Sequence, residues 1–552
     1  MSKLIDAIHD QLPKFNPIVA EGVAVSQMEQ VEAYIDNIFK LSAQSFPPGL
    51  VYKGYERCTV EEEFDFIAEK KNQTHNLELA PSSLYLVKYF FEFHGKPLIP
   101  RPIYLPFVDK GGTITFRGKQ FVIMPVLADQ TLSVAKEGIF VPFLSAKITF
   151  KKMSYWFKLN GEQKNHDLIW SKIYNQDPSK QPRRSTRADL SIRANSTMPH
   201  YLFCKYGVRE VFRRFCGIDN LIIVDGQVDR QQYPESDWVV CSSSGIRPRN
   251  VRNKEYRSPT IKIVAPKNKI SNSFLGMVTG FFYVLDHYTH RFDGSVFEID
   301  PDPEMQVFNV ESEIRLWRIV LGHVIFTNKN SDGSLELKIR DHFDSLDQYV
   351  DDTTREGLEA QGYQVEDLYD LMAILVSDYN QIYMETNVAS MYGKQLAVNR
   401  YVLAEIVKAI SIFKYKLISI KNRELTEADI NKYTAKYLKP ELIFNNLTKH
   451  NEITSEQCSD DNMMFKHTSR IILQEKATGL TAGKSGTSFK DPSKLLDASI
   501  AEAGSILDLP KAEPTGHTVL NPYLVLDKTY KIKQSAELKP LIKLIEKHIV
   551  RG

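Results

Sequence analysis

The sequence lacks paired cysteines, a long apolar run and an excess of charge of either sign. Its five cysteines lie far apart and form no C-x-x-C pair, which excludes a disulfide scaffold and a compact zinc site. The longest strongly apolar stretch, Phe274 to Leu285, is too short to cross a membrane. Because the formal net charge is only +2, any attraction for nucleic acid has to come from local patches. We therefore expect a soluble chain in a reducing compartment, without membrane contact.

An acidic cluster suited to two-metal phosphoryl transfer is also missing from the sequence. Such chemistry needs two or three carboxylates held a few ångströms apart on a rigid frame. The acidic pairs of the chain all lie in polar segments, which we interpret as solvated loops. These pairs are Asp300 with Asp302, Asp351-Asp352 and Asp460-Asp461. We therefore expect neither a catalytic residue nor a metal or cofactor site on this chain.

Length and composition indicate a multidomain globular protein. A chain of 552 residues is too long for one ordinary core. Its 43% hydrophobic and 25% charged residues are close to the averages of soluble proteins, so the chain should fold. Apolar residues recur at helical spacing from Gln27 to Phe93, whereas four prolines between Pro97 and Pro106 exclude a helix and introduce a strand-rich region. The expected fold class is mixed α/β, of the α+β type.

The local patterns after this region predict further strands and helices. Two β-prone runs, Thr113 to Phe116 and Gln120 to Val126, flank a glycine-containing turn and predict a hairpin. The strand pattern continues at Ile148 to Leu159. Helical spacing is found at Pro199 to Phe215, Glu311 to Ile325, Val365 to Val376 and Lys394 to Ile420.

Two basic segments without helical periodicity are candidates for contact with DNA phosphates. The segment from Arg247 to Arg257 holds five cations in eleven residues, and Pro248 prevents a regular helix there. The polar connection from Asn175 to Ser196 is the second. Extended basic loops suit phosphate backbones, but runs of charge are often only solvated surface, so both interpretations stay open. The candidate contact residues are Arg183, Arg184, Arg187, Arg247, Arg249 and Arg252.

The segment from Gly479 to Ser485 looks like a phosphate-binding P-loop but has the wrong spacing. A Walker loop needs four residues between its glycines, and three separate Gly479 from Gly483 here. No buried strand that ends in an aspartate follows at a suitable distance to hold magnesium. A P-loop nucleotide-binding enzyme is therefore one alternative, and a flexible basic loop is the other.

Three segments, in this order along the chain, resemble the β subunit of multisubunit DNA-directed RNA polymerases. Leu105 to Ile123 is similar to the family's "DKGTF" segment with its hairpin, and Ser154 to Leu159 lies where the family has a Gly-Ser-Trp strand. Met198 to Phe212 is similar to its "P-x-x-x-LLRALGY" helix. Thr478 to Asp491 aligns without a gap to the fork motif "GGLTRERAGFEVRD" and is the most specific of the three. The identical residues there are Gly479, Leu480, Thr481, Gly486 and Asp491.

This resemblance implies roles for single residues around the fork. Lys484 and Lys490 stand at family arginines and would support the downstream DNA edge or the incoming nucleotide by charge. Arg470 would support the wall of the RNA–DNA hybrid. Gly479 and Gly486 would provide the bends of the fork loop. The chain departs from the family's arginines at Ile471 and Ala482.

The resemblance also implies an architecture and a set of partners. Because the chain ends soon after the fork motif, it resembles the N-terminal half of a split β-type subunit, as in giant bacteriophages. The implied parts are a protrusion-like domain at 1–175, a lobe-like domain at 176–390, protrusion-like helices at 391–465, and a fork-like region with a C-terminal helix at 466–552. Such a subunit would line the DNA cleft of a nucleotidyltransferase that transcribes DNA. Its Mg²⁺ would be bound by a β′-type partner.

The expected partners are a C-terminal β-type fragment, β′-type fragments, the DNA template and the RNA transcript. The expected location is the host bacterial cytoplasm during infection, and packaging in the virion stays open. An alternative from another class is a virion structural or DNA-packaging protein that touches DNA non-specifically, because basic loops serve either role.

Overall fold

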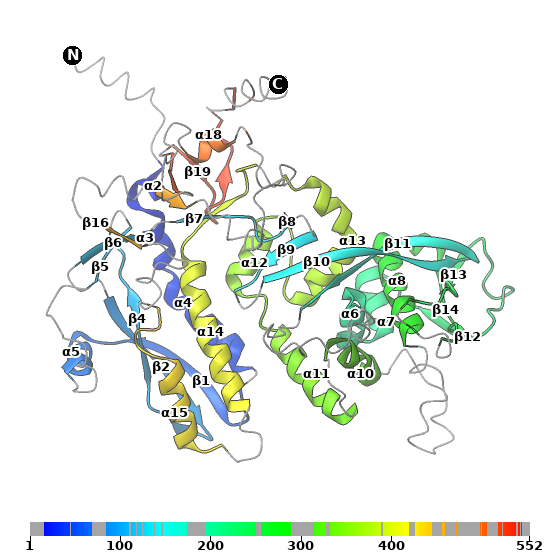
Figure 1. Cartoon of the computed structure of the whole chain (residues 1–552), viewed down its shortest axis with the longest axis horizontal. Coiled ribbons are helices and arrows are strands. Elements are labelled where there is room, and N and C mark those ends of the chain that lie inside the picture. Colours follow the sequence, from blue (N-terminus) through cyan, green and yellow to red (C-terminus); the bar gives the residue numbers. More distant parts are fainter. Residues whose placement is uncertain are drawn as a thin grey trace.

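The computed structural model contains two large bodies, with a smaller unit where they meet (Figure 1). Each unit has its own hydrophobic core and contains both helices and strands, which confirms the expected mixed class. None of the described helices is long and apolar enough to span a bilayer. The structure describes residues 16–44, 46–68, 84–109, 112–116, 119–123, 125–135, 138–144, 147–173, 195–249, 251, 256–288, 314–326, 332–387, 390–418, 425–443, 455–458, 470–472, 497, 499–504, 517–521, 523–536, 539–540 and 543.

The first body, on the left of Figure 1, combines the N-terminal part of the chain with helices that follow residue 398. In its main antiparallel sheet β2 lies between β1 and β4. Phe39 of α4 packs against Tyr52 of β1 and Tyr89 of β2, and α14 contacts α4 to complete the core. The elements are α3 (Val23–Met28), α4 (Val31–Ala43), β1 (Leu50–Arg57), α5 (Val60–Ala68), β2 (Leu84–Phe93), β3 (Lys96–Pro97), β4 (Arg101–Pro106), β5 (Thr113–Phe116), β6 (Lys119–Ile123), α14 (Asn399–Ile418), α15 (Glu427–Tyr437) and β16 (Ser455–Cys458).

The helical prediction for Gln27 to Phe93 is right for α4 and α5 but wrong for β1 and β2. Strand β2 is rich in Tyr, Val and Phe, which suit a pleated, half-buried surface. Its buried side chains alternate from Val87 to Phe93, and Leu86 on the opposite face is buried as well. Apolar residues therefore follow one another closely in the sequence, and this dense spacing imitates that of a helix.

The strand-rich region and the hairpin predicted after Phe93 are both present. Strand β4 pairs with β2 and with no other described strand, so the prolines in β4 sit at a sheet edge, where a missing N–H is tolerated. Strands β5 and β6 pair antiparallel, with Phe116 opposite Lys119 at the predicted turn. Strand β16 adds to the other side of β6. Local turn chemistry was sufficient to predict this hairpin.

The second body, on the right of Figure 1, is a seven-stranded sheet with surrounding helices. Its strand order is β12-β14-β13-β10-β9-β8, and β11 pairs with β10. The long strand β10 joins the two halves of the sheet, because β9 pairs with its beginning and β13 with its end. The elements are β8 (Ser133–Ala135), β9 (Gly138–Pro142), β10 (Lys147–Leu159), β11 (Glu162–Ser171), α6 (Met198–Tyr206), α7 (Val208–Cys216), β12 (Ile222–Asp225), β13 (Trp238–Ser243), β14 (Ile261–Pro266), η2 (Lys267–Lys269), α8 (Asn272–His287), α10 (Ile314–Ile325), α11 (Asp332–Leu346), α12 (Asp352–Glu359) and α13 (Leu368–Glu385).

Helix α8 is the central helix of the second body. Most of its side chains are buried, so the apolar stretch Phe274–Leu285 forms a core helix. Two glycines allow its neighbours to approach closely. A Cβ at Gly276 would lie 2.5 Å from Val376 of α13, and a Cβ at Gly280 would lie 2.4 Å from Pro199 of α6. A larger residue at either position would push the helices apart.

The acidic pair Asp351-Asp352 is part of a helix N-terminus. The interpretation of this pair as a solvated loop is wrong, because Asp351 is 5% exposed and caps α12. Its Oδ1 accepts a hydrogen bond from the Thr354 backbone N–H at 3.0 Å. Carboxylates at this position satisfy unpaired N–H groups and oppose the helix dipole. The pairs at 300 with 302 and at 460 with 461 lie outside the described residues.

A third, small core lies where the two bodies meet, at the top of Figure 1. The chain passes from the first body to the second through β7 and returns through β15, and these two strands pair antiparallel. The buried side chain of Gln27 accepts from the Val398 N–H at 2.7 Å and donates to the Leu396 carbonyl at 2.6 Å. The elements are α2 (Pro17–Glu21), β7 (Val126–Ala128), β15 (Gln395–Ala397), β17 (Arg470–Ile472), α18 (Ile500–Ala503), β18 (His517–Val519), β19 (Val525–Leu526) and β20 (Ile532–Lys533).

The boundaries between the two large hydrophobic cores fall at β7 and β15 along the chain. Residues 132–173 share a core with residues 198–382, whereas the sequence-based boundary was placed at 175. The hairpin of β10 and β11 accounts for the difference. Sequence patterns predict that such strands form, but they do not indicate which core the strands will join.

Candidate nucleic-acid interface

The predicted basic loop connects β13 with β14 in the second body. Its described residues are 244–249, 251 and 256–260. Arg247 and Arg249 are exposed. The Arg247 guanidinium donates a hydrogen bond to the Val251 carbonyl, so this side chain also holds the turn of the loop. Within the part of the chain that the structure describes, no carboxylate pairs with Arg249.

Both ends of this loop are fixed to one buried carboxylate, that of Asp286 in the last turn of α8. Its Oδ1 accepts hydrogen bonds from Ser243 Oγ at 2.5 Å and from the Tyr256 hydroxyl at 3.4 Å. Its Oδ2 accepts from the Tyr155 hydroxyl of β10 at 2.8 Å. Ser243 ends β13 and Tyr256 lies near the end of the basic segment, so Asp286 ties the loop to the core helix and to the sheet.

The environment of Asp286 makes it a positioning residue. It is fully buried, and burial raises the pKa of its carboxyl to about 6 while the hydroxyl donors oppose that rise. Because the Asp286 side chain has no exposed surface, it acts through the loop that it holds. Its three hydroxyl partners satisfy the acceptor oxygens that burial would otherwise leave unpaired.

Two lysines lie on the sheet beside the loop. The strand register places Lys158 opposite Ser242, and Ser242 opposite Lys262, so both lysines project from the same face of the sheet. Trp156, two positions before Lys158, projects from that face too and is 47% exposed. A Cβ on Gly245 would lie 4.0 Å from Lys158 Nζ, which places this ammonium beside the start of the loop.

We call this surface the basic face. Its cations can bind phosphates, and an exposed indole can stack on an unpaired base. The basic face consists of Trp156, Lys158, Arg247, Arg249 and Lys262.

The structure places few of the other predicted site residues. Arg470 begins β17 in the junction sheet, whereas Arg247 and Arg249 belong to the second body, so the structure does not bring them into one site. The backbone of Arg470 is described, and Arg470 pairs with Val519 of β18. The remaining predicted contact and fork residues lie outside the described residues. They are Arg183, Arg184, Arg187, Arg252, Gly479, Lys484, Gly486 and Lys490.

Sequence reasoning missed Asp286, Lys158 and Lys262. Asp286 could have been noticed, because it directly follows the apolar stretch Phe274–Leu285 and an acidic residue there needs partners. No local pattern marks the two lysines. They become neighbours only through the pairing of β13 with both β10 and β14.

Within the described ranges, no three or more His, Cys, Asp or Glu side chains come together in a way that could hold an ion. The thiols of Cys58, Cys204, Cys216 and Cys241 are free.

Comparison with known proteins identifies the family of the chain. A search of curated proteins found no match. A protein-family profile described as "Non-virion RNA polymerase subunit" matches residues 1–546. The match covers both large bodies and the junction between them. The chain therefore belongs to the family of non-virion RNA polymerase subunits.

Proposed function

We propose that the chain is the N-terminal part of a β-type subunit of a viral, multisubunit DNA-dependent RNA polymerase. Its family supports the broader assignment to a viral RNA polymerase, and the fork-like motif at Thr478 to Asp491 supports the β type. The non-virion description favours a polymerase that acts in the infected cell over one packaged in the virion. It also favours this function over a virion structural or packaging protein.

The observation that carries a DNA-binding role is the basic face. Lys158 and Lys262 project from one sheet face beside the exposed Trp156, and the loop with Arg249 is held next to them through Asp286. Ammonium and guanidinium groups bind the phosphates of any sequence, which suits an enzyme that moves along its template. Trp156 adds a platform for unpaired bases of an opened duplex.

The described elements on either side of the fork-like segment belong to the junction unit. Strands β17 and β18 pair antiparallel, with Ile472 opposite His517. The fork-like segment follows β17 and precedes α18, whose Ala503 packs into the small core, so both of its flanks are anchored at the junction. We propose that its cations contact DNA, the hybrid or the incoming nucleotide, and that its glycines make the bends. These residues are Arg470, Lys484 and Lys490, with Gly479 and Gly486 at the bends.

The chemistry of RNA synthesis is assigned to partners. In this proposal a C-terminal β-type fragment and β′-type fragments complete the enzyme, and Mg²⁺ is bound by the β′-type chain. Template and transcript pass along the surface of this chain, in the cytoplasm of the infected host. The residues of this chain hold and orient nucleic acid by charge, while the metal would stabilise the reacting phosphates.

A pair of matched double variants tests the basic face in the assembled polymerase. Replacing Lys158 and Lys262 by Ala should lower the slope of log affinity for duplex DNA against log salt by about 1.8, at roughly 0.9 for each lost phosphate contact. The control replaces Lys267 and Lys269 of η2 by Ala, which removes the same charge at the far end of β14.

The slope of the Lys158 and Lys262 double variant should differ clearly from the slope of the control double variant. Filter binding or fluorescence anisotropy over a range of salt concentrations measures them. If both double variants change the slope equally, or if neither does, the basic face is ordinary solvated surface and the assignment is wrong.

A further inference from the structure

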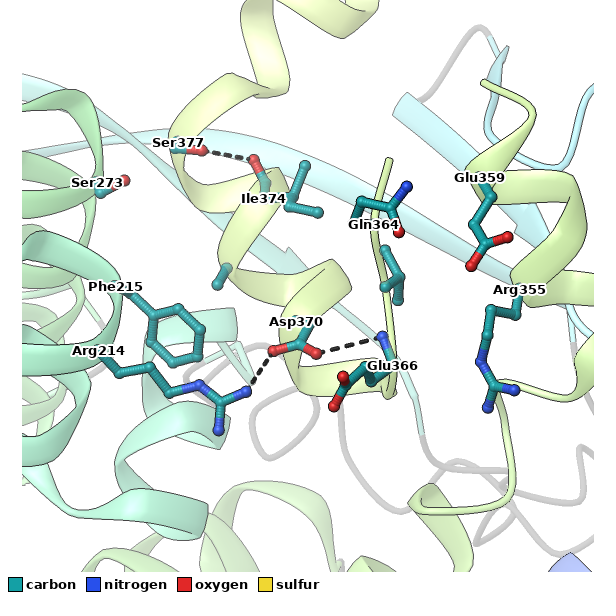
Figure 2. A pocket seen from close by; sticks show the side chains of 12 residues that line it. Arg214, Phe215, Ser273, Arg355, Glu359, Gln364, Glu366, Asp370, Ile374 and Ser377 are labelled. Carbon is teal, nitrogen blue, oxygen red and sulfur yellow. Dashed lines mark hydrogen bonds and ion pairs between the residues drawn. The ribbon is translucent and has the colours of Figure 1, made fainter. Parts of the chain in front are cut away.

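A wide pocket opens in the second body, and none of the residues that line it belongs to the basic face (Figure 2). It has a volume of about 940 Å³ and is walled by α7, the start of α8, α12 and α13, with the segment 364–366 between the last two. Figure 2 shows Arg355 and Glu359 one turn apart on α12, facing the side chains of the other walls.

One wall of the pocket is fixed by an ion pair. The Arg214 guanidinium donates to Asp370 Oδ1 at 2.8 Å, and Asp370 Oδ2 accepts from the Glu366 backbone N–H at 3.3 Å. The guanidinium carbon of Arg214 also lies 5.2 Å from the ring centroid of Phe215. Both charges of this wall are therefore matched, and Phe215 presents an apolar surface beside them.

Two carboxylates of the pocket are not matched. Glu359 and Glu366 are exposed, and within the described residues neither side chain accepts a hydrogen bond or joins an ion pair. Arg355 already pairs with Asp352, at 2.9 Å. The pocket thus carries an excess of negative charge beside the apolar side chains of Phe215 and Ile374.

We propose that this pocket receives a segment of another polymerase subunit that carries a lysine or arginine next to an apolar side chain. A cation would pair with Glu359 and Glu366, and the apolar neighbour would cover Phe215 and Ile374. Nucleic acid fits poorly, because the unmatched carboxylates repel phosphates. A small apolar ligand also fits poorly. Pockets for such ligands are mostly apolar with few polar groups, whereas charged and polar side chains line most of this pocket. The proposal rests on the family membership and is independent of the basic face.

Site-specific crosslinking in the assembled polymerase tests the occupant. The photoreactive amino acid p-benzoylphenylalanine is placed at Gln364, which is exposed and lines the pocket. The expected product is a crosslink to another subunit, within a segment that holds a lysine or arginine beside an apolar residue. A crosslink to DNA or RNA, to a second copy of this chain, or to no molecule at all would overturn the proposal.

Charge reversal identifies the groups that hold the segment. Replacing Glu359 and Glu366 by Lys should reduce the crosslink at least tenfold, whereas Glu385→Lys with Glu441→Lys should leave it unchanged. The control residues are exposed carboxylates outside the pocket. Circular dichroism confirms that each variant is folded. The salt dependence of DNA binding should not change in the pocket variant, so a failure here differs from a failure of the basic face. Equal crosslinking in both double variants would refute the charge match.

Discussion

Among single residues, His200 and Asp286 are buried ionisable groups with opposite consequences for the response to pH. His200 lies in the core of the second body, and Asp286 lies beneath the basic loop. The protein offers a convenient reporter for both. All four tryptophans, Trp156, Trp170, Trp238 and Trp317, belong to the second body, so intrinsic fluorescence follows the unfolding of that body alone.

His200 should make the second body less stable in mild acid. Its Nε2 lies 3.0 Å from the Trp317 carbonyl, and burial lowers its pKa from 6.5 to about 4. The stability that the neutral ring contributes is present above pH 6.5 and is lost as the pH falls toward 4. The loss amounts to about 3 kcal/mol at roughly 1.4 kcal/mol for each pH unit.

Urea unfolding followed by tryptophan fluorescence at pH 7 and pH 5 measures this effect. His200→Gln keeps an N–H donor but cannot be charged, so the difference in free energy of unfolding between parent and variant should shrink at pH 5. An equal difference at both pH values would show that His200 does not titrate in this range.

Asp286 should act in the other direction. Because burial raises its pKa from 3.8 to about 6, its contribution is fully present below pH 3.8 and is lost as the pH rises through 6. Relative to Asp286→Asn, the parent should lose up to about 3 kcal/mol between pH 4 and pH 7. The same unfolding assay at pH 5 and pH 7.5 tests this expectation. A parent that gains stability relative to the variant over that range would contradict the assigned shift.

Among elements, the pair α6 and α7 shows how one glycine divides a predicted helix. The helical spacing from Pro199 to Phe215 is correct, but the chain bends at Gly207, which has φ 83° and ψ 160°. This conformation is available almost only to glycine. The bend lets α6 pack on α10 and α13 while α7 remains against α8.

Gly207→Ala should therefore destabilise the second body by about 1–3 kcal/mol, the cost of forcing a side chain into this backbone region. Gly333→Ala is the matched control. Gly333 lies in α11, and an added Cβ there meets no atom within 4 Å, so alanine should be neutral or stabilise by up to about 1 kcal/mol. Tryptophan fluorescence in urea compares the two. Similar losses in both variants would mean that the bend at Gly207 is not strained.

For the whole molecule, the crossings at β7 and β15 are the dominant feature. The second body is inserted into the first between these strands, and β17 and β18 extend the same sheet. The basic face and the flanks of the fork-like segment therefore belong to units that meet at one junction sheet. This arrangement suits a chain that holds nucleic acid for an active centre built by its partners.

The isolated chain should not synthesise RNA. The sequence holds no acidic cluster of the kind that binds two catalytic metals, so incorporation of nucleotides should require the partner subunits. A template-directed incorporation assay compares the purified chain with the assembled polymerase in the presence of Mg²⁺. RNA made by the purified chain alone would contradict the assignment of catalysis to a partner.

The sequence by itself determined the features that depend on neighbouring residues. The hairpin of β5 and β6, strand β10 and helix α14 were predictable, because turn chemistry and apolar spacing act over a few residues. The exposed basic loop with Arg247 and Arg249 was also visible. The polymerase resemblance came from short motifs, and the family match confirmed its broader part.

Only the tertiary structure decided which residues meet. Strands β1 and β2 were taken for helix because burial on both faces of β2 hides the alternation of a strand. Lys158 and Lys262 are brought to one face of the sheet by the pairing of β13 with β10 and β14. The Asp286 carboxylate accepts hydrogen bonds from hydroxyl groups of three separate segments. Such contacts depend on the register and packing of distant segments, and no local spacing along the chain encodes them.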